Sequence, residues 1–275
     1  MTKVQEQQVL RVTSKDGSSI AYERSGEGAP VILVAAALAD RTGTRRLAKA
    51  LAPEYTVINF DRRGRNDSTE HEPYDVQREV DDIEALIDAA GGQAVLFGSS
   101  SGSVLALDAA NRLGDKVSKV VVFEPPFIVD DSREPMPADL DADVRKLIAE
   151  QQPGAVVKLF MHKTMGIPKF AVNIMSIMPG WSSMRAAAHT LPHDLELMRG
   201  TQDGTPLPAE RWKAVSAPVL VMTGGRSEQF FHRGADALVE VLADGRHEVL
   251  KGQGHGVVLM NPKALLPQFN AFVAG

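Results

Sequence analysis

Three consecutive serines between two glycines are the residues of this sequence that most suggest chemistry. The segment "GSSSG" (98–102) matches the pattern G-x-S-x-G only when Ser100 is the central serine. An apolar run precedes it and a stretch with helical spacing follows, so the chain must turn sharply, and the glycines leave room for that turn. The turn exposes the Ser100 hydroxyl and places the backbone N–H of Ser101 at a helix start, which favours negative charge. The pattern predicts a nucleophile at Ser100, with a purely structural turn as the alternative.

A serine hydroxyl is a weak nucleophile at neutral pH and needs a base. Among the seven histidines, His255 lies in the glycine-rich segment "KGQGHGVV" (251–258), between the last expected strand and the C-terminal helix. We expect that loop to return to the sheet edge where Ser100 lies. The sequence therefore predicts His255 as the general base.

The elements that must position these residues alternate along the chain. Apolar runs typical of buried strands are separated by stretches of about a dozen residues with helical spacing. After a hairpin around Asp16-Gly17, the expected strands lie at 30–38, 56–61, 93–98, 117–124, 217–225 and 246–252. This order predicts an α/β fold with a mostly parallel sheet flanked by helices.

The alternation stops between residues 129 and 211. This stretch holds seven of the ten methionines. Its place after the sixth strand predicts a helical lid over the carboxyl ends of the strands, with residues 1–128 and 212–275 forming the core. The candidate substrate contacts in the lid are Met161, Met165, Trp181 and His189. The alternative is that such side chains only pack the lid against the core.

Composition argues against several kinds of site and partner. The chain has no cysteine, which excludes disulfides and a thiol nucleophile. Its net charge of −5 is spread along the sequence, so we expect no nucleic-acid partner. Because no apolar stretch is long enough to span a membrane, we also expect no membrane partner and a cytoplasmic location. No metal-ligand spacing stands out, so we expect neither a metal nor another cofactor. A small-molecule substrate is the expected partner, and a homodimer stays open.

Four segments together resemble the serine hydrolase branch of the α/β-hydrolase superfamily. They are "VILVAAAL" (31–38), "NFDRRGRNDS" (59–68), the "GSSSG" segment and "GQGH" (252–255). The resemblance implies the α/β-hydrolase fold with an inserted lid and a catalytic triad in the chain order Ser, acid, His. It also implies an oxyanion hole made by the backbone N–H groups of Ala37 and Ser101. Many members carry His-Gly where this chain has Ala35 and Ala36, but a backbone donor needs no particular side chain.

The acid of the triad departs from the family's usual pattern. Ser227 stands where an aspartate is common, after the strand "PVLVMTGG". Glu228 is its neighbour, and Glu124 ends the strand that follows the nucleophile's helix. Placement after that strand, with proline following, resembles the zearalenone-type lactone hydrolases. We predict Glu124 as the acid and keep Glu228 as the alternative.

The resemblance and the apolar lid predict a hydrolase of a carboxylic ester or lactone of a small, largely apolar molecule. The reaction would pass through an acyl-enzyme on Ser100. The alternatives are a non-catalytic ligand-binding protein or receptor on the same fold, a perhydrolase, a C–C hydrolase and a hydroxynitrile-type lyase.

Overall fold

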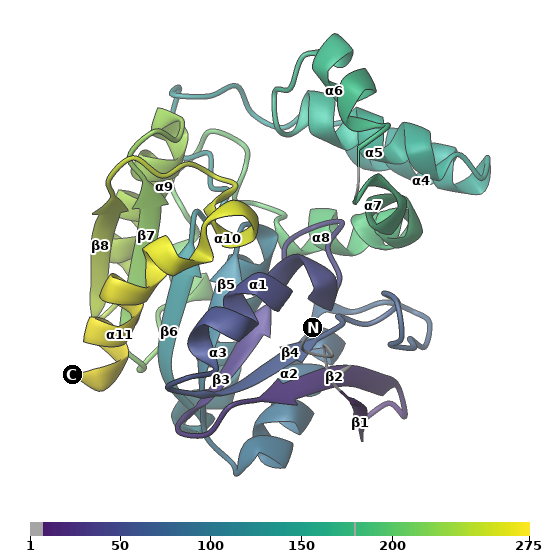
Figure 1. The fold of residues 1–275 in the computed structure, drawn as a ribbon. Coiled ribbons are helices and arrows are strands. Elements are labelled where there is room, and N and C mark those ends of the chain that lie inside the picture. The colour runs from purple at the N-terminus through teal and green to yellow at the C-terminus, as the bar shows by residue number, and fades with distance from the viewer. Residues whose placement is uncertain (1–7, 179) are drawn as a thin grey trace, which may run out of the picture.

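A computed structural model describes residues 8–178 and 180–275 of the chain. Its centre is one eight-stranded sheet with the spatial order β1-β2-β4-β3-β5-β6-β7-β8 (Figure 1). The strands are Val9–Thr13 (β1), Ser19–Ser25 (β2), Pro30–Val34 (β3), Thr56–Phe60 (β4), Ala94–Ser99 (β5), Val117–Phe123 (β6), Val219–Gly224 (β7) and Gly245–Leu250 (β8). The predicted α/β fold class is confirmed.

The pairing of the strands follows from their sequences. β2 runs antiparallel to β1 and β4, and every other neighbouring pair is parallel. The first pair is joined by a tight turn in which Gly17 has a φ of 87°, a conformation that glycine adopts without strain. The central strands β4 and β5 are buried along their whole length, which explains why most of their residues are apolar.

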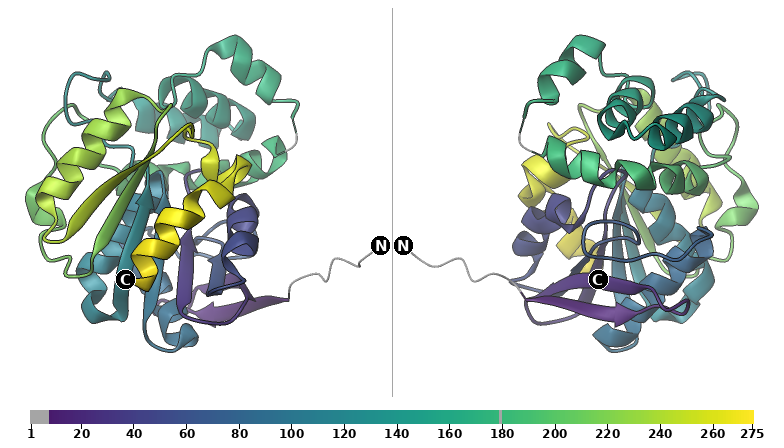
Figure 2. Two further views of the ribbon diagram at one scale, coloured as in Figure 1. Left: turned by 60° about the vertical axis from the view of Figure 1, so that its left-hand side comes forward. Right: turned by 90° about the vertical axis from the view of Figure 1, so that its right-hand side faces the viewer.

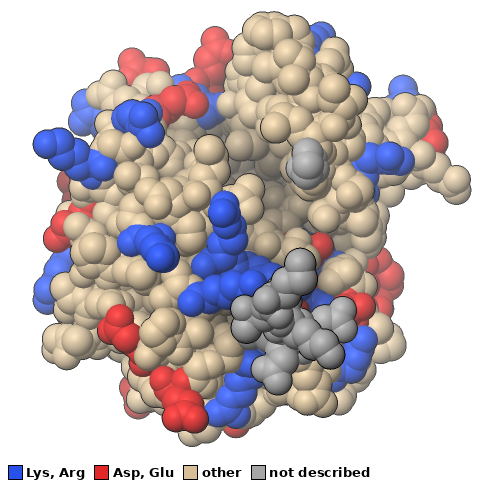
Figure 3. Space-filling model, viewed as in Figure 1, with Lys and Arg blue, Asp and Glu red and all other residues tan. Residues whose placement is uncertain are grey.

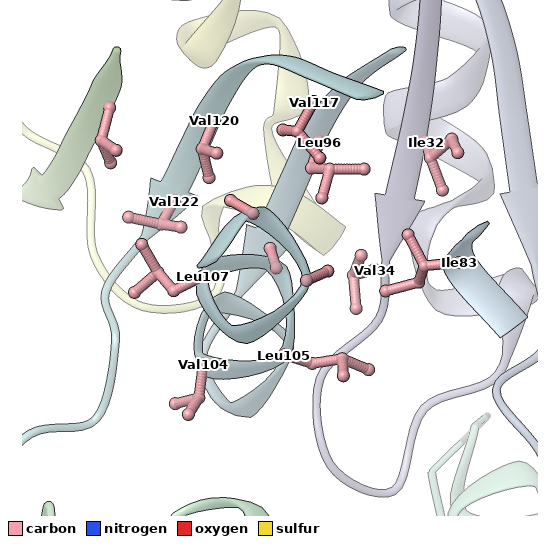
Figure 4. Packing of buried hydrophobic residues seen from close by; sticks show 14 of the residues in the cluster. Ile32, Val34, Ile83, Leu96, Val104, Leu105, Leu107, Val117, Val120 and Val122 are labelled. Atoms are coloured by element: carbon pink, nitrogen blue, oxygen red, sulfur yellow. The ribbon is translucent and has the colours of Figure 1, made fainter. Parts of the chain in front are cut away.

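Helices cover both faces of the sheet (Figure 2). The covering helices are Arg41–Leu51 (α1), Val76–Ala90 (α2), Ser101–Leu113 (α3), Gln229–Val241 (α9), Val257–Met260 (α10) and Leu266–Ala274 (α11). One apolar cluster joins α2, α3 and α9 to one face, and a second joins α1, α10 and α11 to the other. Figure 4 shows Val104, Leu105 and Leu107 of α3 packed beneath the central strands. The two layers fix the start of α3, where Ser100 lies.

Among the described residues, five further α-helices lie between β6 and β7, above the carboxyl ends of the strands (Figure 1). They are Leu140–Ala149 (α4), Pro153–Lys163 (α5), Lys169–Met175 (α6), Trp181–Ala187 (α7) and Leu191–Leu197 (α8), and we call them the cap. The cap has its own apolar cluster, which includes Phe160, Met161 and Trp181 and reaches Leu38 of the core. That the cap acts as a lid stays a prediction.

None of the helices within the described ranges combines the length and apolar character needed to cross a bilayer.

Candidate active site

Ser100 lies at the sharp turn between β5 and α3. Its backbone has φ 51° and ψ −125°, a strained conformation for a residue with a side chain. The flanking glycines are required by close approaches: a Cβ atom on Gly98 would lie 2.4 Å from the Gly102 carbonyl oxygen, and one on Gly102 would lie 2.4 Å from the Val34 carbonyl oxygen. The Ser100 N–H donates to the Phe123 carbonyl at 2.9 Å, which ties the turn to β6. The fold therefore presents this hydroxyl at the end of β5 nearest the cap.

His255 and Glu124 form a hydrogen-bonded pair beside that turn. His255 Nδ1 lies 2.6 Å from Glu124 Oε2, and the backbone N–H of Gly224 donates to Glu124 Oε1 at 2.7 Å. The Glu124 carboxylate is fully buried, so both of its oxygens are used to hold neighbours in place. The pair leaves Nε2 of His255 as the nitrogen free to exchange a proton.

Ser100 and His255 line the same cavity. In the described part of the chain no hydrogen bond joins Ser100 Oγ to the His255 ring, and such contacts commonly tighten when substrate binds. The Phe231 ring stacks on the His255 ring with the centroids 4.8 Å apart, which limits the ring's rotation.

Glu228, the alternative acid, lies elsewhere on the cavity wall. It directly precedes α9, its side chain is 63% exposed, and Arg133 Nη1 lies 3.5 Å from its Oε1. Ser227, at the family's usual acid position, has a buried hydroxyl without a hydrogen-bond partner among the described residues. The structure therefore brings Glu124, rather than Glu228, to the histidine.

Ala37 and Ser101 both line the cavity, as an oxyanion hole requires. Their backbone N–H groups have no acceptor among the residues that the structure describes. Hydrogen bonds from Arg65 fix the loop that carries Ala37. Arg65 Nη1 donates to the carbonyl oxygens of Ala36 at 2.8 Å and Ala39 at 2.9 Å. The residues that carry these two N–H groups therefore line the same cavity as Ser100, and their role as an oxyanion hole stays a prediction.

A buried carboxylate from the cap supports both sides of this arrangement. Asp194 of α8 accepts hydrogen bonds from the Ser101 hydroxyl at 2.8 Å, from Arg62 at 2.6 Å and from Arg65 at 2.7 Å. Arg62 also pairs with a second buried carboxylate, that of Glu79. Burial favours the neutral form of this carboxyl group, but the neighbouring positive charge of Arg62 favours the ionised form and helps to lower the pKa of Glu79 to about 2. The basic turn "DRRGRNDS" therefore serves as internal support for the site.

The cavity has a volume of about 200 Å³ and opens between the cap and the core, where Figure 3 shows the surface hollowed. Of the candidate lid contacts, Met165 lies on its wall. Met161 and Trp181 pack in the interior of the cap instead. His189 bonds through Nε2 to the Gly64 carbonyl at 2.8 Å and faces a different hollow.

Several wall residues are not among the candidate substrate contacts that the sequence predicts. They come from the segment after β6, from α5, from the loop after α8 and from the start of α9: Pro126, Ile128, Arg133, Met136, Phe160, Thr164, Met198, Gln202, Phe230 and Phe231. Aromatic pairs and single polar residues of this kind are common in any core, so only the assembled fold identifies them. The described residues contain no cluster of three or more His, Asp or Glu that could hold a metal ion.

Comparison with known proteins gives the same architecture. An alpha/beta hydrolase from Sphaerobacter thermophilus is 44% identical, with a TM-score of 0.89 over 96% of this chain and 100% of that one. An esterase from Exiguobacterium antarcticum has a TM-score of 0.75 at 19% identity, covering 98% of this chain and 100% of that one, which shows the fold alone.

One curated relative is the uncharacterized hydrolase YraK of Bacillus subtilis. It is 34% identical over 113 residues, which are 40% of this chain and 42% of YraK. The model of the Alpha/beta hydrolase family matches residues 31–268, which is most of the chain. The chain thus belongs to the alpha/beta hydrolase family.

Proposed function

We propose that this protein hydrolyses a carboxylic ester or lactone of a small, largely apolar molecule through an acyl-enzyme on Ser100. The observation that carries the proposal is the contact between the buried Glu124 carboxylate and His255 Nδ1, which are 2.6 Å apart. His255 lines the same cavity as Ser100, whose backbone is strained. This arrangement supports the roles of nucleophile for Ser100, base for His255 and orienting acid for Glu124.

The reaction proceeds in two steps. His255 Nε2 takes the proton of Ser100 as Oγ attacks the carbonyl carbon, and Glu124 stabilises the imidazolium that forms. The tetrahedral oxyanion accepts hydrogen bonds from the N–H groups of Ala37 and Ser101, each worth about 3 kcal/mol in the transition state. His255 then protonates the leaving alcohol. In the second step His255 deprotonates a water that attacks the acyl-enzyme, and it then returns this proton to Ser100 Oγ as the acid is released. The sequence of steps requires no cofactor.

Two observations favour Glu124 over Glu228 as the acid. Glu124 is fully buried and has a second anchor in the Gly224 N–H, so its position is fixed. Glu228 is mostly exposed and has Arg133 as its partner. We also propose that the cap, within the inserted stretch 129–211, closes over the substrate.

Kinetics of paired variants test this assignment. We expect Glu124→Gln to lower kcat for a neutral methyl or 4-nitrophenyl ester by several orders of magnitude, because the histidine loses its orienting carboxylate. Glu228→Gln leaves the Glu124–His255 pair intact and should keep a rate within several-fold of the wild type. The reverse result, with the Glu228 variant inactive and the Glu124 variant active, would transfer the role to Glu228.

A non-catalytic binding protein is the competing interpretation, since Ala35 and Ala36 replace His-Gly. A panel of esters, lactones and thioesters of graded chain length separates the two, with Ser100→Ala as the control. Turnover of an ester or lactone that depends on Ser100 supports the enzyme, and binding without turnover across the panel supports the receptor.

A further inference from the structure

Arg133 is the one arginine on the wall of the Ser100 cavity among the described residues. It lies in the segment between β6 and the cap, and only 13% of its side chain is exposed. Its Nη2 donates to the Thr164 carbonyl at 2.6 Å, and its Cζ lies 4.4 Å from the centroid of the Phe230 ring. A backbone carbonyl and a ring face thus fix the position of the guanidinium without neutralising its charge.

Three arginines buried in the core are neutralised differently. Arg62, Arg63 and Arg65 each have a carboxylate oxygen within 2.7 Å, and those carboxylates are at most 2% exposed. Arg133 has only Glu228, at 3.5 Å and with a side chain that is 63% exposed. Glu228 is therefore a weak and movable partner, while the arginines of the core have short and buried ones.

The guanidinium also has unused hydrogen-bonding capacity. Of its five N–H groups, one donates to Thr164 and one points at Glu228, and the others have no acceptor among the described residues. Most of the remaining wall is apolar, including Ile128, Met136 and Phe230. A fixed guanidinium on an apolar wall binds a planar carboxylate well, because arginine offers paired donors and water competes less.

We propose that the substrate of this site is an ester that carries a carboxylate at the end remote from the scissile bond, and that Arg133 binds this carboxylate in place of Glu228. The inference rests on the proposed function and narrows its substrate class to esters whose apolar chain ends in a carboxylate, such as the half-esters of dicarboxylic acids. Water cleaves the ester bond, so the products are the alcohol and the dicarboxylate, and no further reactant is needed.

The test compares monomethyl adipate with methyl hexanoate, which replaces the free carboxylate by a methyl group. We expect the wild-type protein to have the higher kcat/KM for monomethyl adipate at pH 8, measured in a pH-stat. Arg133→Gln should lower the ratio of the two kcat/KM values by about tenfold or more, the size expected for a lost charged hydrogen bond. Glu228→Gln should raise the ratio by about threefold, because it removes the competing carboxylate.

Arg145→Gln is the matched control, because Arg145 lies on the cap, is 57% exposed and pairs with Asp141 outside this cavity. It removes the same charge and should leave the ratio as it is. A wild-type protein that prefers methyl hexanoate would overturn the inference and leave the proposed ester hydrolysis standing. So would an Arg133→Gln variant that loses both activities in equal proportion, since that result assigns Arg133 to holding the cap.

Binding separates this inference from the proposed function. In the Ser100→Ala background, calorimetry should show tighter binding of monomethyl adipate than of methyl hexanoate, and about tenfold weaker binding of the half-ester after Arg133→Gln. That result supports the carboxylate site even if turnover is absent. Equal binding of both esters contradicts it even if turnover is fast.

Discussion

Ser100 and Glu124 share an unusual backbone conformation. Both have positive φ, 51° and 48°, although neither is a glycine. Such strain persists only where the surroundings impose it, and it is common at functional sites. Here the surroundings are β6 and β7, because Ser100 donates to the Phe123 carbonyl and Glu124 donates to the Met222 carbonyl, each at 2.9 Å. The site is thus set by backbone bonds between neighbouring strand ends.

Gly102→Ala tests the turn at this scale. Its Cβ would lie 2.4 Å from the Val34 carbonyl oxygen, so β3 and α3 would have to separate. We expect a loss of about 3 kcal/mol in the free energy of unfolding, measured in urea, with loss of most ester turnover. Gly154→Ala is the control, because its nearest neighbour is an Arg185 atom at 3.8 Å. A Gly102→Ala protein as stable as the wild type would contradict the packing of the turn.

At the scale of elements, helix α8 of the cap is coupled to the oxyanion hole. Asp194 accepts hydrogen bonds from the Ser101 hydroxyl, from Arg62 and from Arg65, and Arg65 also donates to the loop of Ala37. Removing this carboxylate would leave two buried cations short of a partner, which costs about 3–5 kcal/mol. Asp194→Asn is therefore expected to unfold at lower urea concentration than any other variant described.

Ser101→Ala is the milder test of the same coupling. It removes the 2.8 Å bond to Asp194 but keeps the backbone N–H that would face the oxyanion. We expect kcat to fall several-fold with little change in KM, and stability to fall by about 1 kcal/mol. A change in stability alone would show that the bond does not position the donor.

The sequence predicts the elements better than it predicts the contacts between them. Local signals predict Ser100 as the nucleophile and His255 as the base, since each lies in a glycine-rich turn beside a strand. Glu124 is predicted as the acid because it ends a strand. Asp194 is not predicted, because its partner Arg65 lies 129 residues away and either residue alone looks like an ordinary surface charge. Arg133 is missed for the same reason. Its place on the cavity wall cannot be read from the sequence, because the cavity forms only when the cap packs against the core.

At the scale of the whole molecule, His193 makes stability depend on pH. It is packed at the junction of cap and core, with its ring stacked 3.8 Å from Tyr74. Burial and the nearby arginines lower the pKa of His193 to about 4. The unfolded chain takes up this proton near pH 6.5, so unfolding becomes easier as pH falls from 6.5 to 4, by roughly 3 kcal/mol.

His193→Gln should remove this loss, and the difference between the two unfolding curves against pH isolates it. Asp82 acts in the opposite direction, because burial raises its pKa to about 6 in the folded protein. As pH falls, the folded protein binds this proton at a higher pH than the unfolded chain does, which stabilises the folded state. The Asp82 effect is common to both proteins and cancels in the difference. A His193 ring that titrates near pH 6.5 by NMR would contradict the prediction.

The central claim is that Ser100 is a nucleophile activated by His255. The most direct measurement is the intact mass of the folded protein after treatment with a fluorophosphonate, followed by mapping of the modified peptide. We expect one adduct, on Ser100, that is absent after Ser100→Ala and forms far more slowly after His255→Ala. An unmodified folded protein, or an adduct on Ser99 or Ser101 in place of Ser100, would contradict it.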